Sequence, residues 1–351
     1  MKLYQSLILL FCRHALVYSA MGTERKFVYF FDGKTGDTKA IPKQSSGLGI
    51  TRPLLVECLE KEALKCPKVS IKRGMGISGI TRDDKGILAT LEDGTVLSGF
   101  SHCAGADGKW SKVRQSTSSL NSRAEMITSK SWGVNLYSSK IPKGFDLDGT
   151  YVINPAKECM FYIIVSPLPT HGISISMVCY DDTLERYPWL APSSERVDGY
   201  HSWENEYSAL PAGLHTDNEL AQNLERLFEE TVPAFFQLLD KECFSTARIN
   251  RRVGWIKMVQ DNPSYSTEDG RIALVGDSIH AMTPSLGEGA NTAMESSVKL
   301  VDCVSEIMKE KGESTCSIES LNEGFIKYGI DRPGECIPIV EASAARSKLK
   351  K

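Results

Sequence analysis

Alternation of apolar and polar residues marks the middle of the chain. The segments that show it are Trp132–Leu136, Tyr151–Asn154, Phe161–Val165 and Ile173–Tyr180. Because successive side chains of a strand point to opposite faces, this period of two predicts an antiparallel sheet with one buried and one solvated face. Two helical patterns follow the sheet and the strand pattern then returns, in Asn218–Glu230, Pro233–Leu239 and Arg251–Val259 respectively.

The residues before this sheet predict shorter elements. Residues 22–46 predict short strands around a turn at Asp32-Gly33. Residues 52–65 predict a helix, and residues 69–103 predict a strand meander whose last strand ends at residues 105–108. The apolar residues of the helix that we expect to face inward are Leu55, Leu59 and Leu64.

Residues 272–302 predict a buried strand, a loop and an amphipathic helix in direct succession. Ile272–Val275 is a continuous apolar run, typical of a parallel strand covered on both faces, and Gly276-Asp277 ends it at a sharp turn. Glycines and a proline then shape a loop before the helix. Backbone N–H groups at a helix start favour a flat or anionic ligand, so this segment predicts a cofactor-binding surface. The apolar positions of the helix are Met294, Val298, Val301 and Val304.

The segment Gly74–Gly79 matches the GxGxxG dinucleotide fingerprint by its letters. The fingerprint binds phosphates only when a helix follows directly, so that the N-terminal N–H groups of the helix face the ligand. A turn and the strand pattern Ile87–Leu91 follow here instead. We therefore interpret the segment as a glycine-containing strand of the meander.

Composition narrows the class of protein. A chain of 351 residues with 41% hydrophobic content can bury a sizeable core, and a net charge of −3 gives no basic surface for nucleic acid. The ten cysteines form no CxxC pair and have no histidine cluster nearby, which predicts neither a metal site nor a disulfide framework. We interpret His280 as a packing or hydrogen-bonding residue and assign no metal ligand.

The first 21 residues do not follow the pattern of the rest. Leu7–Phe11 is apolar but too short to span a bilayer, and Arg13 and His14 follow it, so neither a membrane span nor a secretory signal is expected. We expect a cytoplasmic protein, with mitochondrial association as the alternative. The sequence carries no signal for the oligomeric state.

Three segments resemble one enzyme family. The pattern GD-x-x-H-x-x-x-P-x-x-G-x-G-x-N-x-A-x-E in Gly276–Glu295 resembles the flavin-binding GD motif of the single-component FAD-dependent aromatic hydroxylases, the class A flavoprotein monooxygenases. Cys103–Arg114 resembles the DG motif of that family, and Arg52-x-x-Leu55 resembles its Arg-x-x-Leu segment. The three occur in family order within residues 22–335. Asn154-Pro155 and the strands after it are most similar to the kynurenine 3-monooxygenase branch.

This resemblance implies a mixed α/β (α+β) fold similar to those of glutathione reductase and 4-hydroxybenzoate hydroxylase. It implies an atypical N-terminus at residues 1–21, a FAD-binding lobe at 22–130 and 256–345, and a substrate lobe with an antiparallel sheet at 131–255. The family begins with a strand, a GxGxxG turn and a helix that hold the FAD pyrophosphate. This sequence enters the family pattern near Gly22, so we expect a truncated fold that lacks the GxGxxG unit.

The resemblance also assigns cofactor-binding residues in the GD motif. Asp277 would accept a hydrogen bond from a ribityl hydroxyl, with a turn or N-cap aspartate as the alternative. Backbone amides would approach the O2/N1 side of the isoalloxazine, where negative charge develops on reduction and where a helix N-terminus is stabilising. These amides belong to Gly287, Gly289, Ala290 and Asn291.

Other positions have a structural alternative beside the cofactor role. Pro284 would stiffen the chain at the flavin edge, or only break structure before a helix. Arg52 would clamp the pyrophosphate or the ribityl chain, or be an exposed arginine at a helix start. Asp107 would lie near the cofactor and serve structure more than chemistry. Glu288 stands where the family most often has glutamine, and an inward-pointing carboxylate there would disfavour anionic reduced flavin.

The implied function is an FAD- and NAD(P)H-dependent monooxygenase that uses O2 to hydroxylate a small aromatic or conjugated substrate through a flavin C4a-hydroperoxide. Such chemistry needs no protein nucleophile, so no catalytic residue is assigned. The substrate would lie between flavin and sheet, near Tyr162, Met177 or Trp255, which are also ordinary core candidates. Two alternatives stay open: a non-catalytic remnant or binding module unable to retain FAD, and a related flavin reductase or dehydrogenase.

Overall fold

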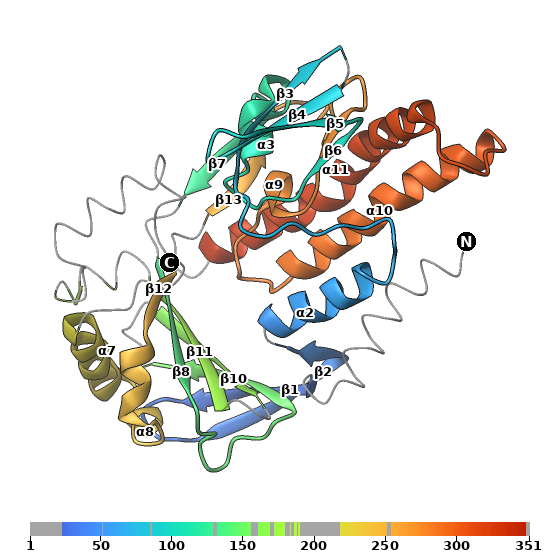
Figure 1. Cartoon of the computed structure of the whole chain (residues 1–351). Coiled ribbons are helices and arrows are strands. Elements are labelled where there is room, and N and C mark those ends of the chain that lie inside the picture. Colours follow the sequence, from blue (N-terminus) through green and yellow to red (C-terminus); the bar gives the residue numbers. More distant parts are fainter. Residues whose placement is uncertain are drawn as a thin grey trace. The chain divides into compact units, whose positions relative to one another are not determined.

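A computed structural model describes most of the chain, in two compact units (Figure 1). The described residues are 23–50, 52–84, 86–128, 132–155, 161–168, 172–179, 183, 186–187, 189, 218–250 and 254–348. The first unit takes the described residues within Met1–Ile71 and Lys130–Arg252, and the second takes those within Lys72–Ser129 and Val253–Lys351. The expected mixed α/β (α+β) class is confirmed. The atypical N-terminus at residues 1–21 lies outside the described residues.

The first unit is built on a seven-stranded sheet of order β12-β8-β11-β10-β9-β1-β2. Its strands are β1 (Thr23–Asp32), β2 (Thr38–Gly49), β8 (Trp132–Ser138), β9 (Gly149–Asn154), β10 (Phe161–Leu168), β11 (Gly172–Cys179) and β12 (Arg248–Asn250). Its helical elements are α2 (Arg52–Ala63), α7 (Asn218–Thr231), α8 (Pro233–Phe236) and the short 3-10 helix η3 (Lys241–Thr246). The antiparallel pairing of β8 to β11 confirms the strand pattern of the middle of the chain.

One face of this sheet packs against helices, as the alternating pattern predicts. Ile163 in β10 pairs with Ile153 in β9 and with Met177 in β11, and all three side chains are buried. They share a hydrophobic core with Leu224 and Phe228 of α7, which lies beside the sheet in Figure 1. Alternate residues such as Tyr162 and Ile164 are only half-buried, because they point to the opposite face.

The strands nearest the N-terminus belong to this sheet. β1 pairs in parallel with β9, from Phe27 opposite Gly149 to Asp32 opposite Asn154, and β2 pairs antiparallel to β1. The resemblance implies one FAD-binding segment at residues 22–130, whereas the described residues up to Ile71 lie in the first unit. Strand pairing over more than one hundred residues leaves no local signal in the hydrophobic pattern, which accounts for the difference.

Helix α2 confirms the expected helix but not its inward face. Leu55 is half-buried, whereas Leu59 and Leu64 are 39% and 51% exposed. Val56 on the same helix is also exposed. The apolar residues are spread around the helix rather than aligned in one stripe, so no single face could be chosen for the core.

The second unit combines three small sheets with two long helices. Its strands are β3 (Ile77–Asp83), β4 (Gly86–Leu91), β5 (Val96–Phe100), β6 (Cys103–Gly105), β7 (Ala124–Thr128), β13 (Gly254–Met258) and β14 (Ile272–Leu274). Its helices are α3 (Lys112–Ser116), α4 (Ser118–Asn121), α9 (Asp277–His280), α10 (Gly289–Glu310) and α11 (Ile318–Lys348). The meander β3-β4-β5 is confirmed, and Gly74–Gly79 runs into β3 with no helix after it. That segment is therefore no phosphate-binding turn.

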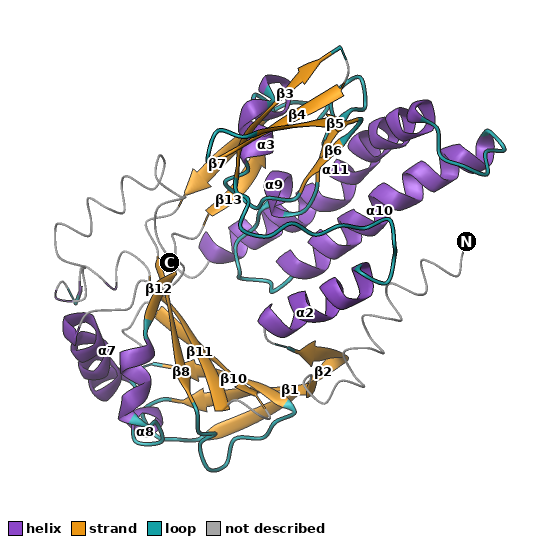
Figure 2. Ribbon diagram, viewed as in Figure 1, coloured by secondary structure: helices purple, strands orange, loops and turns teal. Residues whose placement is uncertain are grey.

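Helices α10 and α11 run side by side (Figure 2) and bury a different face of α10 from the one expected. Met294 and Val301 are 37% and 56% exposed. The buried residues of α10 are Thr292, Ser296, Leu300 and Cys303. Hydroxyl groups face α11 because α11 presents the buried Arg332 to them, and a buried guanidinium requires hydrogen-bond acceptors.

Helix α11 continues through two prolines, Pro333 and Pro338. Proline at position 333 removes the N–H that would bond the carbonyl of Gly329. The backbone N–H of Tyr265 donates to that carbonyl instead, at 3.0 Å. Among the described residues, no helix has the length and hydropathy that a membrane span requires.

The centre of the large sheet predicts a sharp difference between two isoleucines. Ile163→Ala removes a fully buried side chain and should lower the free energy of unfolding by about 2–5 kcal/mol. Ile41→Ala, in the edge strand β2, removes a side chain that is 43% exposed and should cost less than about 1 kcal/mol. Urea denaturation of both variants measures the difference. Equal losses would contradict the position of the core.

Candidate cofactor site

The DG and GD segments are joined by a parallel strand pair. β6 and β14 pair as Cys103–Ile272, Ala104–Ala273 and Gly105–Leu274. The backbone N–H of Val275 extends the pairing by donating to the carbonyl of Gly105 at 2.9 Å. Both strands therefore end at one sheet edge, where ligands collect in open α/β sheets.

The packing at this edge leaves no space for a side chain at Gly105. A Cβ atom at Gly105 would lie 2.7 Å from Cγ1 of Val113 and 2.9 Å from Cδ2 of Leu274. Such distances are far below van der Waals contact, so only glycine lets α3 pack against the two strands. The DG motif thus brings the start of α3 close to the tip of the GD strand.

Asp107 organises the turn that follows β6. Its carboxylate accepts hydrogen bonds from the backbone N–H groups of Lys112 and Val113, at 2.6 and 3.1 Å. Ser111 caps the same helix, because its Oγ accepts from the N–H of Arg114 at 2.9 Å. These bonds satisfy the free N–H groups at the start of α3, which is the structural role expected for Asp107.

Buried hydrogen bonds connect the DG segment to the GD segment. Arg114, 4% exposed, donates to the carbonyl of Ser278 and, at 2.8 Å, to that of Lys109. Ser278 Oγ donates in turn to the carbonyl of Gly105 at 2.7 Å. Burial lowers the pKa of Arg114, and the charge of Asp107 opposes that shift. The sequence analysis gave neither Arg114 nor Ser278 a role, although Arg114 ends the quoted DG motif.

Asp277 lies exposed at the tip of β14, where it begins the single-turn helix α9. Gly276 before it has φ of +66°, and a Cβ there would come within 3.0 Å of Cβ of Ala293. Glycine is therefore required both by the backbone conformation and by the close approach of α10. The sequence pattern predicts only a turn at this point and gives no signal for α9.

The loop after α9 leads into the N-terminus of α10. Pro284 is exposed and its carbonyl accepts from the N–H of Gly287 at 3.1 Å. Gly287 has φ of +74°, and no atom lies within 4 Å of where its Cβ would be. A ligand could therefore approach the backbone at Gly287 without meeting a side chain.

The first turn of α10 presents backbone donors. Glu288 is the N-cap residue but makes no side-chain capping bond, and its carboxylate instead accepts from Nδ2 of Asn291 at 3.0 Å. The N–H groups of Gly289, Ala290 and Asn291 have no partner within the helix, because the first turn has no preceding carbonyls. The positive end of the helix dipole adds to their attraction for an electronegative ligand edge.

The loop is anchored to α11 at one point. The N–H of Thr283 donates to Oγ of Ser343 at 3.2 Å, and its Oγ1 donates to the carbonyl of Ser343 at 2.8 Å. Ser285 Oγ donates to the same carbonyl at 2.6 Å. The sequence does not predict these hydrogen bonds, because no pattern links serine and threonine residues that lie about 60 positions apart.

His280 is buried beside this loop and makes no metal site. Its Nε2 lies 2.8 Å from Oγ of Ser296, which also accepts from Nε of Arg332 at 2.9 Å. Burial, together with the positive charge of Arg332, lowers the pKa of His280 to about 4. Among the described residues, no group of histidine, cysteine and carboxylate side chains could hold a metal ion.

The remaining candidates belong to other elements of the chain. Arg52 begins α2 in the first unit, and its side chain lies outside the described residues. Met177 is 1% exposed on the helix-covered face of the sheet, in agreement with its alternative interpretation as an ordinary core residue. Tyr162 is half-buried on the opposite face, and Trp255 is half-buried in β13 of the second unit.

The chain belongs to the FAD binding domain family, whose model matches residues 37–317. FAD-dependent monooxygenase verC1 of Penicillium polonicum is 23% identical over 335 residues, which are 89% of this chain and 35% of that protein. The chloroplastic zeaxanthin epoxidase of Spinacia oleracea is 25% identical over 66% of this chain and 28% of its own length. The chain therefore spans about a third of the length of these curated relatives.

Solved structures share the fold. Klebsiella pneumoniae HpxO complexed with FAD and uric acid has a TM-score of 0.62 and 18% identity, over 97% of this chain and 76% of that one. CtdE in complex with FAD has a TM-score of 0.66 and 13% identity, over 96% of this chain and 78% of that one. The expected flavoprotein monooxygenase fold is thereby confirmed.

The buried imidazole of His280 predicts an acid-sensitive fold. Its pKa of about 4 in the folded chain lies below the ordinary 6.5, so the unfolded chain binds the proton more readily. The contribution of neutral His280 to the free energy of unfolding is fully present above pH 6.5. It is lost as the pH falls towards 4, and the loss is about 3 kcal/mol at most. His280→Gln should flatten this pH dependence of the free energy of unfolding in urea.

His102→Gln is the matched control, because burial also lowers the pKa of His102 but that ring is only partly buried. The control should retain most of the pH dependence. If the wild-type chain and the His280 variant lose stability in parallel between pH 7 and 4.5, His280 is not the titrating group.

Proposed function

We propose that this chain binds FAD and acts as an FAD- and NAD(P)H-dependent monooxygenase on a small aromatic or conjugated substrate. The observation that carries the proposal is the single sheet edge where β6 and β14 end, with Asp277 exposed beside the loop into α10. Membership of the FAD binding domain family supports the cofactor, and relatives described as FAD-dependent monooxygenases support the reaction class.

The residues of the second unit suit the flavin end of the cofactor. Asp277 would accept a hydrogen bond from a ribityl hydroxyl, and the N–H groups of Gly289, Ala290 and Asn291 would donate to the electronegative flavin edge. The open space at Gly287 leaves room for that edge to approach the backbone. Pro284 would limit the movement of the loop, since its φ is fixed.

Asp107 and Arg52 have different parts in this proposal. Asp107 would act indirectly, because its carboxylate is already bonded to the N-terminus of α3. Arg52 would bind the phosphate or ribityl part of the cofactor through its permanent positive charge. Gly74–Gly79 would take no part, because it leads into β3 rather than into a helix.

When bound, FAD supplies the redox chemistry by which NAD(P)H and O2 convert a substrate C–H to C–OH, with NAD(P)+ and water as the other products. The chain would bind and orient the reactants and exclude water from them, which needs no side-chain nucleophile. The only groups we assign to the reaction are therefore the cofactor-binding residues.

The half-buried face of the large sheet carries side chains that would suit a ring-shaped, weakly polar substrate. Tyr162 and Ile164 in β10 and Val152 in β9 alternate outward from the helix-covered core. Asn135 and Ser176 lie opposite each other on β8 and β11 and share a hydrogen bond of 2.8 Å. Aromatic and aliphatic side chains with a few neutral hydrogen-bonding groups are typical of sites for small conjugated ligands.

The role of Asp277 predicts a specific loss of FAD affinity. Asp277→Ala removes a charge-assisted hydrogen bond and should weaken FAD binding by about 1.5–3 kcal/mol, roughly one to two decades in Kd. Fluorescence titration with FAD measures the change, and a melting curve excludes unfolding. Flavin bound to the wild-type chain should absorb at about 450 nm.

Gly76→Ala is the control for the fingerprint look-alike. The atoms nearest to a Cβ at Gly76 would be those of the exposed carboxylate of Glu92, which can move away, so FAD affinity should not change. A large loss in the Gly76 variant alone would move the cofactor to residues 74–79. If the wild-type chain neither absorbs near 450 nm nor quenches added FAD, the non-catalytic remnant replaces the proposal.

The carboxylate of Glu288 predicts a shift in the flavin potential. Glu288→Gln removes a negative charge at the N-cap of α10 and keeps an acceptor for Asn291. Reduced flavin should then be stabilised by on the order of 1 kcal/mol, which raises the midpoint potential. Glu310→Gln makes the same charge change at the far end of α10 and should leave the potential unaltered. Equal potentials in both variants would place Glu288 away from the flavin.

A further inference from the structure

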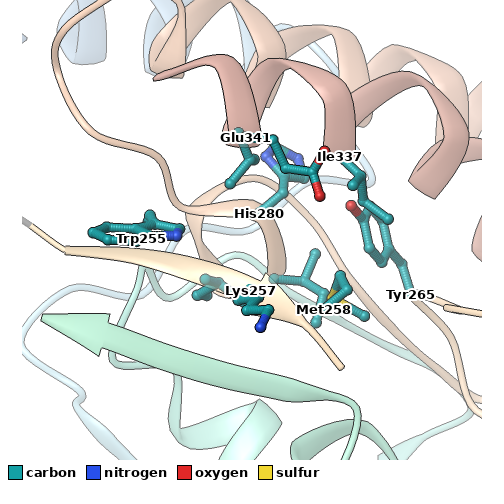
Figure 3. A pocket seen from close by; sticks show the side chains of 10 residues that line it. Trp255, Lys257, Met258, Tyr265, His280, Ile337 and Glu341 are labelled. Carbon is teal, nitrogen blue, oxygen red and sulfur yellow. The ribbon is translucent and has the colours of Figure 1, made fainter. Parts of the chain in front are cut away.

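A small cavity lies within the second unit next to His280. Its volume is about 30 Å³, and β13, α9, α11 and Tyr265 form its walls. In Figure 3, Lys257 and Met258 of β13 lie on one side and Ile337 of α11 on the other, with His280 and Tyr265 between them. A space of this size accommodates roughly one or two water molecules and no larger ligand.

Two buried polar atoms at this cavity have no hydrogen-bond partner among the described residues. They are Nδ1 of His280 and Oη of Tyr265, on side chains that are 1% and 0% exposed. The two rings lie 5.8 Å apart between centroids. Burial raises the pKa of Tyr265, and the nearby thiol of Cys336 adds to this shift, but a thiol is a weak hydrogen-bond partner. An unpaired buried polar atom is costly, so the cavity favours a ligand that bonds both.

The hydrogen bonds of Ser296 determine which nitrogen of His280 carries the proton. Ser296 Oγ donates its one proton to the carbonyl of Thr292 at 2.8 Å and accepts from Nε of Arg332 at 2.9 Å. Its remaining lone pair faces Nε2 of His280 at 2.8 Å. This arrangement favours the tautomer with the proton on Nε2, which leaves Nδ1 as a hydrogen-bond acceptor.

We propose that the cavity binds an ordered water molecule that donates to Nδ1 of His280 and accepts from Oη of Tyr265. The carboxylate of Glu341 also lines the cavity and can accept the second proton of the water. Three polar partners are the usual number for a buried water. The water has the donor and acceptor groups that the two orphaned atoms require.

This water would complete a chain of hydrogen bonds that ends at the cofactor loop. From His280 the chain passes through Ser296 to Arg332, whose NH2 group donates to the carbonyl of Thr292 at 3.0 Å. Thr292 lies in the first turn of α10, so the water helps to keep that turn in position. Only the link to the flavin rests on the proposed function, and the water site stands without it.

The test is 15N NMR of histidine-labelled protein without FAD. In the wild-type chain we expect the His280 signals of an Nε2–H tautomer whose Nδ1 accepts a hydrogen bond. Tyr265→Phe removes one partner of the water with almost no change of shape, and the Nδ1 resonance should move towards that of an unbonded nitrogen. An Nδ1–H tautomer, or an Nδ1 that accepts no bond in the wild-type chain, would overturn the proposal.

Tyr328→Phe is the matched control. Tyr328 is as deeply buried as Tyr265, but its hydroxyl donates to the carbonyl of Leu274 at 3.0 Å and does not line the cavity. This variant should leave the Nδ1 resonance unchanged. Equal shifts in both tyrosine variants would show a general loosening of the core instead of a water site, and would overturn the proposal.

A variant that fills the cavity distinguishes a cavity that holds a water molecule from an empty one. Val340→Ile adds one methyl group to a lining residue. A dry apolar void should accept the methyl with a gain in stability. With water bound, the methyl should displace it, lower the unfolding temperature and shift the Nδ1 resonance, and an unchanged Nδ1 resonance would contradict the proposal. A chain that fails to bind FAD would disprove the proposed function and leave these measurements valid.

Discussion

The parallel pairing of β6 with β14 is the constraint on which the candidate site depends. The two strands are about 170 residues apart in the sequence, yet their register fixes Gly105 beside Leu274. Each strand is only three residues long, so the pairing alone would be weak. The buried guanidinium of Arg114, which bonds the carbonyl of Ser278, reinforces it. Because a buried arginine cannot give up these acceptors without a large cost in free energy, the two segments stay together.

The same principle operates between α10 and α11. Their interface contains hydroxyl groups and Arg332 in addition to apolar side chains, and such a network is stable only when its members are satisfied. Apolar packing tolerates small slides between helices, whereas a guanidinium bonded to Ser296 and to the carbonyl of Thr292 permits one arrangement. These hydrogen bonds thereby fix the position of the first turn of α10 along α11. A site made of backbone donors needs that precision more than it needs particular side chains.

Sequence reasoning predicted the elements better than their partners. The sheet strands, the meander and the strand before Asp277 follow from local periodicity, and each was confirmed. The rejection of Gly74–Gly79 also held, because the missing helix is a local feature. The pairing of β1 with β9 and the burial of Ser296 instead of Met294 were missed, since both depend on a distant segment. The cofactor-binding roles and the kynurenine 3-monooxygenase branch stay predictions.

The position of Asp107 shows why a motif alone does not define a site. Its carboxylate lies at a strand tip, as a ligand-binding residue would, yet it bonds two N–H groups of α3. Asp277 occupies the equivalent tip of the neighbouring strand and is also exposed, but the helix it begins has a single turn. Asp107 thus stabilises the edge itself, whereas Asp277 is exposed at the same edge. Two aspartates with equal sequence signals differ in their structural surroundings because the strands they follow lead into different turns.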